Sequence, residues 1–177
     1  MANKGLAYGL SRECAMKAQA KFSPERAQEC ITWVEELTGQ QLGNIRDQFD
    51  FAEMLKDGVM LCNLINALQP GSVKKINTLK TSFKQRENIE MYLKACATYG
   101  LKEQDLFQVN DLFETKNPHL VVDNIYALGG IAQKKSWTGP ALGKGSFNHH
   151  LFFNGAHPPP QTTNGPLDPQ TPTTPYP

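Results

Sequence analysis

The chain contains 177 residues and carries a formal net charge of +1 at pH 7. This length suits one domain with a flexible extension. A near-neutral charge excludes global electrostatic attraction to nucleic acid or to membranes, so neither is expected as a partner. The beginning of the sequence lacks the apolar h-region of a signal peptide, and no stretch approaches the roughly 20 apolar residues of a spanning helix. We therefore expect a cytoplasmic protein.

The first predicted helix begins at Ser23, which can act as an N-cap before Pro24 and Glu25. Gly39 can end it. Trp33 flanks the apolar stripe, and we expect it to pack at the edge of that stripe. The stripe repeats every three to four residues and consists of Ala27, Cys30, Ile31, Val34 and Leu37.

The second helical segment begins near Asp50, a plausible N-cap, and ends at Pro70 and Gly71. Gly58 lies on its apolar stripe. This glycine either lets another backbone approach closely or divides the segment into two short helices, and we favour the division. The stripe consists of Met54, Gly58, Leu61, Ile65 and Leu68.

The third predicted helix carries a capping box formed by Ser82 and Gln85, and Gly100 follows its last turn. Its expected buried stripe is Phe83, Ile89, Leu93 and Cys96. Residues 103–114 are predicted to add one or two short helical turns against the bundle.

The last helix is predicted to open at Asn117 and Pro118. Its core positions are Val121, Ile125, Leu128 and Ala132. Beyond it the composition changes: most of the prolines follow, with little that could be buried. We expect an N-terminal extension over 1–22, a helical domain over 23–133 and a disordered Pro-rich tail over 134–177.

The search for catalytic and metal-binding motifs fails. Neither Gly-x-Ser-x-Gly nor His-Glu-x-x-His occurs, and the glycine-rich stretch 139–145 lacks the Ser/Thr of a phosphate-binding loop. His119 is expected to be exposed, and the other histidines fall in the tail. Three pairs of carboxylates are expected to be solvated: Glu35 and Glu36, Glu87 and Glu90, Asp111 and Glu114. We therefore predict no enzyme activity, no cofactor and no metal site.

The four cysteines are Cys14, Cys30, Cys62 and Cys96, and none forms a Cys-x-x-Cys pair. The last three lie among apolar residues at helical spacing. We interpret them as reduced core residues, with a disulfide framework as the alternative.

One stretch of the sequence is strongly basic. No acidic residue occurs from Gly58 to Arg86, whereas Lys74, Lys75, Lys80, Lys84 and Arg86 all lie in its second half. Such a segment can dock on an acidic protein surface. The alternative is a solvated loop whose charges only promote solubility.

Several ordered motifs resemble those of calponin homology domains. They are LKDGVMLCNLIN at 55–66, FKQRENI at 83–89 and DLFQVNDLFETKN at 105–117. Residues 2–13 are similar to the start of transgelins and calponins, and residues 139–143 to the post-domain segment of invertebrate muscle relatives. Arg86 departs from the usual methionine of the family and must extend its charge to solvent or lie exposed. No calponin-like repeat follows the domain.

The resemblance implies an all-α calponin homology domain with four main helices and additional short ones. It also implies association with the actin cytoskeleton, by binding or bundling filaments and modulating their organisation or contractility. The candidate actin-binding residues are Lys74, Lys75, Lys80, Lys84, Arg86, Lys116, Lys134 and Lys135. The alternative is a cytosolic signalling scaffold that does not bind actin. Its helical domain would bind a kinase or another protein, and its Pro-rich tail would bind SH3- or WW-type proteins.

Overall fold

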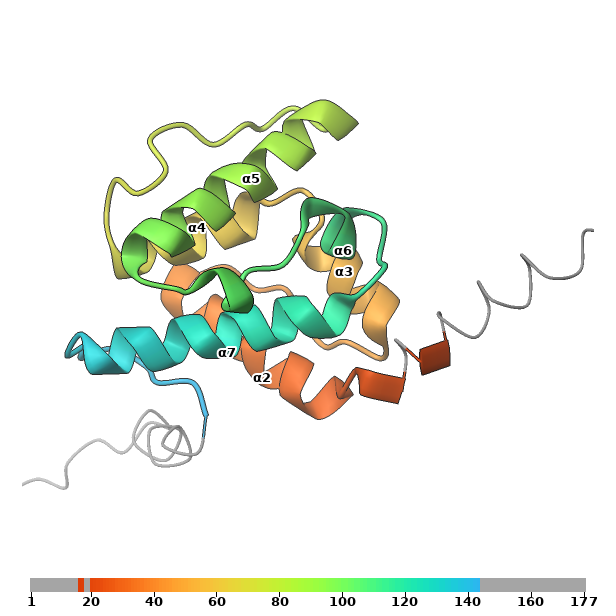
Figure 1. Ribbon diagram of the computed structural model, residues 1–177, viewed down its shortest axis with the longest axis horizontal. Coiled ribbons are helices and arrows are strands. Elements are labelled where there is room, and N and C mark those ends of the chain that lie inside the picture. Colours follow the sequence, from red (N-terminus) through yellow and green to blue (C-terminus); the bar gives the residue numbers. More distant parts are fainter. Residues whose placement is uncertain (1–15, 18–19, 144–177) are drawn as a thin grey trace, which may run out of the picture. The chain divides into compact units, whose positions relative to one another are not determined.

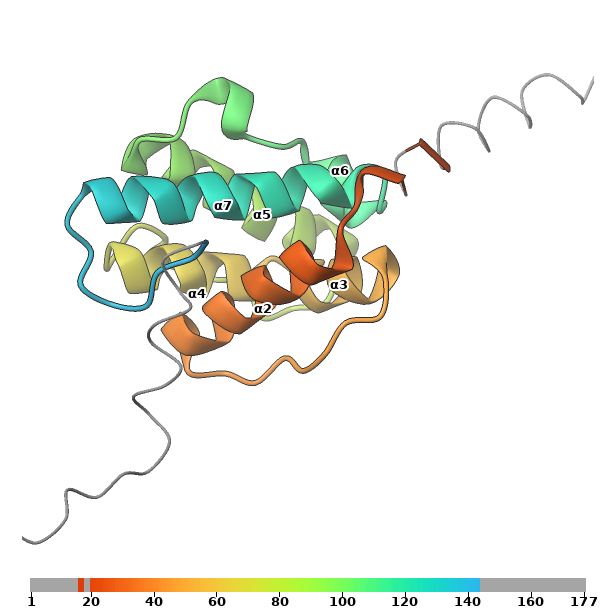
Figure 2. The same cartoon turned by 90° about the horizontal axis from the view of Figure 1, so that it is seen from below.

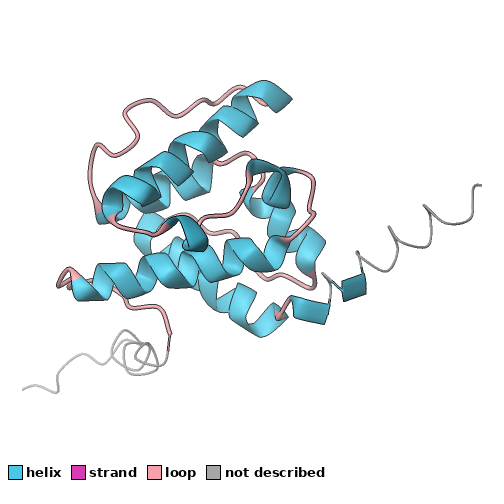
Figure 3. Cartoon of the chain, in the orientation of Figure 1, coloured by secondary structure: helices cyan, strands magenta, loops and turns pink. Residues whose placement is uncertain are grey.

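The computed structural model describes residues 16–17 and 20–143, which form helices and no strand (Figure 3). This confirms the predicted all-α class. The four longest helices are α2 (Pro24–Thr38), α4 (Val59–Leu68), α5 (Ser82–Tyr99) and α7 (Pro118–Lys134). The shorter ones are α3 (Gln48–Leu55), the 3₁₀ helix η1 (Glu103–Asp105) and α6 (Val109–Phe113). None of the described helices is both long and apolar enough to cross a bilayer.

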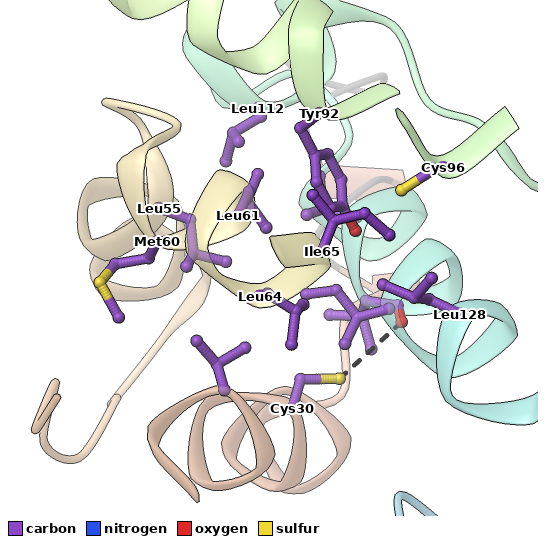
Figure 4. Close-up of a cluster of buried hydrophobic side chains, with 14 of the residues drawn as sticks. Cys30, Leu55, Met60, Leu61, Leu64, Ile65, Tyr92, Cys96, Leu112 and Leu128 are labelled. Carbon is purple, nitrogen blue, oxygen red and sulfur yellow. Dashed lines mark hydrogen bonds between the residues drawn. The ribbon is translucent and has the colours of Figure 1, made fainter. Parts of the chain in front are cut away.

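Helix α4 lies at the centre of the bundle, packed between α2 and α5, with α7 alongside α2 (Figures 1 and 2). Its sequence, VMLCNLINAL, is apolar around almost its whole circumference, which is typical of a helix covered on several sides. Figure 4 shows Leu61 and Ile65 of α4 close to Tyr92 of α5, and all three are completely buried. The core is therefore formed around one central helix.

Three cysteines contribute to this core. Cys30, Cys62 and Cys96 are buried and free, which confirms that they are reduced core residues. Burial raises the pKa of the Cys62 thiol and of the Cys96 thiol to about 12, and it also raises that of Cys30. At neutral pH these side chains are therefore thiols and behave as small hydrophobic groups.

Gly58 separates α3 from α4, as predicted. It has a φ of +70°, in the left-handed region that glycine tolerates. Gly58 also lets another backbone approach closely, which was the alternative expectation. A Cβ at this position would lie 2.7 Å from Asn88 Cβ and 2.9 Å from Ile89 N. The same glycine therefore opens α4 as its N-cap and allows α5 to pack closely.

Two helix starts differ from the prediction. Asp47, rather than Asp50, caps α3, and its carboxylate accepts from Phe49 N at 2.9 Å. The Asp50 carboxylate instead accepts from Arg46 Nε at 2.8 Å. Helix α5 is capped by Thr81, so the predicted capping box at Ser82 is wrong by one residue. Neighbouring residues that can all act as caps make such shifts difficult to foresee.

Residues 136–143, called the strap below, were expected to be part of a disordered tail but pack against the helices. The Pro140 carbonyl accepts from the indoles of Trp33 at 2.8 Å and Trp137 at 3.1 Å. Leu142 is buried against Gly129 of α7. Trp33 is consequently in the core, with 2% of its surface exposed, and not at its edge.

Phe22, assigned to the N-terminal extension, is buried with its ring centroid 5.6 Å from that of Phe51. Two other expectations were wrong about burial. Asp111 is buried because its carboxylate accepts from Gln108 N at 2.8 Å, which caps the start of α6. His119 is half-buried, and desolvation lowers its pKa. The predictions for Cys14, for the motif at 2–13 and for the tail from residue 144 lie outside the described residues.

Candidate docking surface around α5

The linker, residues 69–81, connects α4 to α5 and runs back along the length of α5 (Figure 1). Hydrogen bonds from three side chains fix its backbone. The Asn66 side chain accepts from Val73 N at 2.8 Å and donates to Val73 O at 3.0 Å. Asn88 of α5 forms the same pair of bonds with the Asn77 backbone, each 2.9 Å long. Thr81 caps α5. The linker is irregular, but its path is determined.

Two of the predicted basic residues, Lys74 and Lys75, lie beside an open groove of about 590 Å³ between the linker and the C-terminal half of α5. Lys94 of α5 lines the same groove and was not predicted, because nothing along the sequence shows that the linker passes beside it. The remaining lining residues are Gln69, Pro70, Gly71, Ser72, Val73, Met91, Ala95 and Thr98. The groove therefore has a basic rim.

Lys80 and Lys84 lie at the other end of α5, beside two exposed apolar side chains. Leu79 is 65% exposed and Phe83 is 72% exposed, so the prediction that Phe83 is buried was wrong. The physical reason is the helical period: six residues separate Phe83 from the buried Ile89, which places the two about 120° apart around the helix. Lys84 Nζ lies 5.5 Å from the Phe83 ring centroid.

Glu87 is the acidic partner at this end of α5. Lys84 donates to its carboxylate at 2.7 Å, and Asn77 Nδ2 donates to the same oxygen at 2.9 Å. The hydrogen bond from Lys84 is the main reason why the pKa of Glu87 is lowered. Lys84 is thus partly neutralised, whereas Lys80 forms no ion pair with any residue that the structure describes.

Arg86 reaches from α5 to α6. Its guanidinium lies 4.2 Å above the Phe113 ring centroid and donates to Asn110 and, at 3.1 Å, to Glu114. Lys116 forms a second ion pair with Glu114 at 2.8 Å, and the two cations lower the pKa of this carboxylate, Lys116 more strongly. Arg86 therefore places its charge between an aromatic ring and a carboxylate, an arrangement that differs from the two expected for a cation at this position.

Lys134 and Lys135 lie at the end of α7. Lys135 Nζ is 4.4 Å from the Tyr99 ring centroid, and Lys134 is exposed. The eight candidate cations do not form a single cluster. Lys84 at the start of α5 and Lys94 beside the groove are separated by ten residues of helix, about 15 Å, and Lys134 and Lys135 lie on a different helix. Four of them form no ion pair within the described ranges 16–17 and 20–143: Lys74, Lys75, Lys80 and Lys134.

This arrangement is suited to contact with another protein surface. In the part of the chain that the structure covers, no three His, Cys, Asp or Glu side chains are placed to hold a metal ion. Lys74, Lys75 and Lys80 and the exposed apolar pair Leu79 and Phe83 lie in the linker or at the start of α5, where hydrogen bonds hold the backbone. A partner with acidic side chains could contact several of them at once.

The comparison with protein families decides the identity of the fold. The model of the calponin homology (CH) domain matches residues 24–134. This chain belongs to the calponin homology domain family. The resemblance expected from the motifs at 55–66, 83–89 and 105–117 is thereby confirmed.

Similar proteins include calponin-2 of Bos taurus and of Mus musculus, each 44% identical to this chain over 133 residues. These matches cover 75% of this chain but only 41% and 42% of the relatives, so the chain spans about two fifths of their length. A solved structure, the calponin-homology domain of Rng2 from Schizosaccharomyces pombe, is 29% identical with a TM-score of 0.60. The match covers 74% of this chain and 79% of that one. The calponin-homology domain of an IQGAP protein from the same yeast has a TM-score of 0.59 at 29% identity.

Proposed function

We propose that this protein is an actin-associated component of the cytoskeleton that binds filaments through the surface around α5. The observation that supports this most directly is the linker, whose backbone is fixed at Val73 and Asn77 while Lys74, Lys75 and Lys80 remain exposed. Membership of the calponin homology domain family points to the same setting. The protein acts as a binding module in the cytoplasm, not as an enzyme, and bundles filaments or modulates contractility.

Contacts made by exposed lysines should be weak individually and sensitive to salt. An exposed ion pair contributes only about 0.2–1 kcal/mol and is screened by salt. Lys74, Lys75 and Lys80 together would therefore contribute about 1.5 kcal/mol, which corresponds to roughly a tenfold change in affinity. Binding should weaken as the salt concentration rises.

Co-sedimentation with filamentous actin at low and physiological salt tests the proposal. The wild-type protein should pellet with the filaments, and a variant carrying Lys74→Gln, Lys75→Gln and Lys80→Gln should bind about tenfold more weakly. A control carrying Lys17→Gln, Lys21→Gln and Lys102→Gln removes the same charge from exposed positions outside the linker and should bind like the wild type. Absence of wild-type pelleting at either salt concentration would rule out direct binding.

Binding of SH3- or WW-type proteins or of kinases through the Pro-rich tail stays a prediction, since residues 144–177 are outside the described part. Deleting residues 145–177 separates this scaffold function from actin binding. Capture of such a partner should be lost with the tail, whereas pelleting with filaments should survive. A simultaneous loss of pelleting would show that the filament contact extends beyond the domain.

A further inference from the structure

Leu79 and Phe83 form an exposed apolar pair, called the anchor below, at the start of α5. Both are more than 60% exposed. The other large exposed apolar residues with comparable exposure, Met16 and Phe49, lie in other parts of the described chain and are not close to each other in sequence. Exposed apolar side chains are common singly, whereas here two of them lie only four residues apart, on either side of the residue that caps α5.

The backbone on both sides of the anchor is held in place. Asn77, two residues before Leu79, forms two hydrogen bonds with Asn88. Thr81, between the two anchor residues, caps the helix that carries Phe83. The anchor is therefore presented in one backbone conformation, and a partner loses little conformational entropy by binding it.

Cations surround the anchor. Lys80 and Lys84 each follow an anchor residue directly, and Lys84 lies near the Phe83 ring. Arg86 is three residues beyond Phe83 and therefore near it on the same side of α5, where it extends across Phe113. Glu87 is the nearest acidic residue in sequence, and it is already paired with Lys84. The surface has an apolar centre with a predominantly basic rim.

An apolar centre with a charged rim is the usual composition of a protein interface, in which aromatic residues carry much of the binding energy. We infer that Leu79 and Phe83 are the apolar anchor by which the domain docks on an acidic surface of the actin filament. Lys80 forms no ion pair in the described part of the chain, and Lys84, Arg86 and Lys116 outnumber their partners Glu87 and Glu114, so the net positive charge around the anchor selects such a partner. This inference rests on the proposed function.

The apolar anchor and the lysines of the linker should respond differently to salt. Contacts between exposed charges weaken with increasing salt, whereas apolar burial does not. The lysines should therefore dominate the salt dependence of binding, and the anchor should dominate the affinity that remains at physiological salt.

The test is co-sedimentation of the full chain with filamentous actin at both salt concentrations, using a Leu79→Ser, Phe83→Ser variant. We expect affinity to fall about 10- to 100-fold with an unchanged salt dependence. The control variant, Met16→Ser and Phe49→Ser, removes two apolar side chains of similar exposure elsewhere and should bind like the wild type. Circular dichroism and thermal unfolding show whether each variant is folded.

The outcomes separate the two proposals. If the wild type does not pellet, the proposed function fails and the inference fails with it. If the wild type pellets and the anchor variant binds equally well, the inference alone is overturned. Sedimentation equilibrium without actin measures self-association. If the wild type is a dimer, the anchor variant a monomer and actin binding unchanged, the anchor contacts a second copy of this chain and the inference is again overturned.

Discussion

The linker and the strap are both irregular segments next to helices, but they differ in how much of their side chains is exposed to solvent. The strap buries Leu142 against α7, and its Pro140 carbonyl accepts from two indoles. The linker is held by backbone bonds to Asn66 and Asn88 and by the buried side chain of Val73, but it leaves Leu79 and its lysines in solvent. The strap contributes to the core, whereas the linker presents a surface.

This difference shows that a fixed backbone does not require every side chain to be buried. Polar side chains such as Asn88, which also donates to Asp57 O at 2.8 Å, hold the linker and leave residues 78–81 in its second half exposed. Substitutions in the strap should therefore change stability and leave binding intact. Substitutions at the exposed linker positions should change binding and leave stability intact.

The largest loss of stability is expected at Gly58, which lies between α3 and α4 and packs against Asn88, the residue that holds the linker. Gly58→Ala should lower the free energy of unfolding by about 3 kcal/mol, because left-handed strain adds to a collision with Asn88. Gly39 has the same φ of +70° with nothing within 4 Å of an added Cβ, so Gly39→Ala should cost only about 1 kcal/mol. Denaturant unfolding measures both. Equal losses of stability in the two variants would show that Asn88 can move aside for the added methyl group.

A smaller loss is expected in the strap. Leu142→Ala removes a buried side chain that packs on Gly129 and should cost about 2 kcal/mol, measured by thermal or denaturant unfolding. The emission of Trp33 should also change, since its environment includes the strap. The control, Leu79→Ala, removes the same atoms from an exposed position and should change stability by less than about 0.5 kcal/mol. If both variants lost the same stability, the contrast between the segments would be wrong.

The smallest effect is a dependence on pH at Glu87. Hydrogen bonds from Lys84 and Asn77 lower its pKa from 4.5, so the folded state binds this proton less readily than the unfolded chain. The resulting stabilisation is present above pH 4.5 and is lost as the pH falls through the lower, folded pKa. Urea unfolding between pH 6 and pH 3 should show less acid destabilisation in Glu87→Gln than in wild type. Glu90→Gln, on the exposed face of α5, should behave like wild type.

Much of the fold could be predicted from local patterns. The stripe of Val121, Ile125, Leu128 and Ala132 was correctly assigned to the core because four consecutive turns carry it. The Gly58 break was foreseen because a glycine interrupts a motif. Phe83 was assigned to the wrong face because apolar character alone outweighed its position relative to Ile89. Lys94 was missed because nothing along the chain shows that the linker returns to it.

The sequence by itself determined the helices, the family motifs and the concentration of positive charge between Gly58 and Arg86, since propensity, spacing and composition are local properties. Only the tertiary structure decided which charges remain available. Arg86 and Lys116 form ion pairs with Glu114, and Lys84 forms one with Glu87, whereas Lys74, Lys75 and Lys80 form no ion pair in the described part of the chain. Ion pairs and burial join residues that are distant in sequence, so they follow from packing and not from pattern.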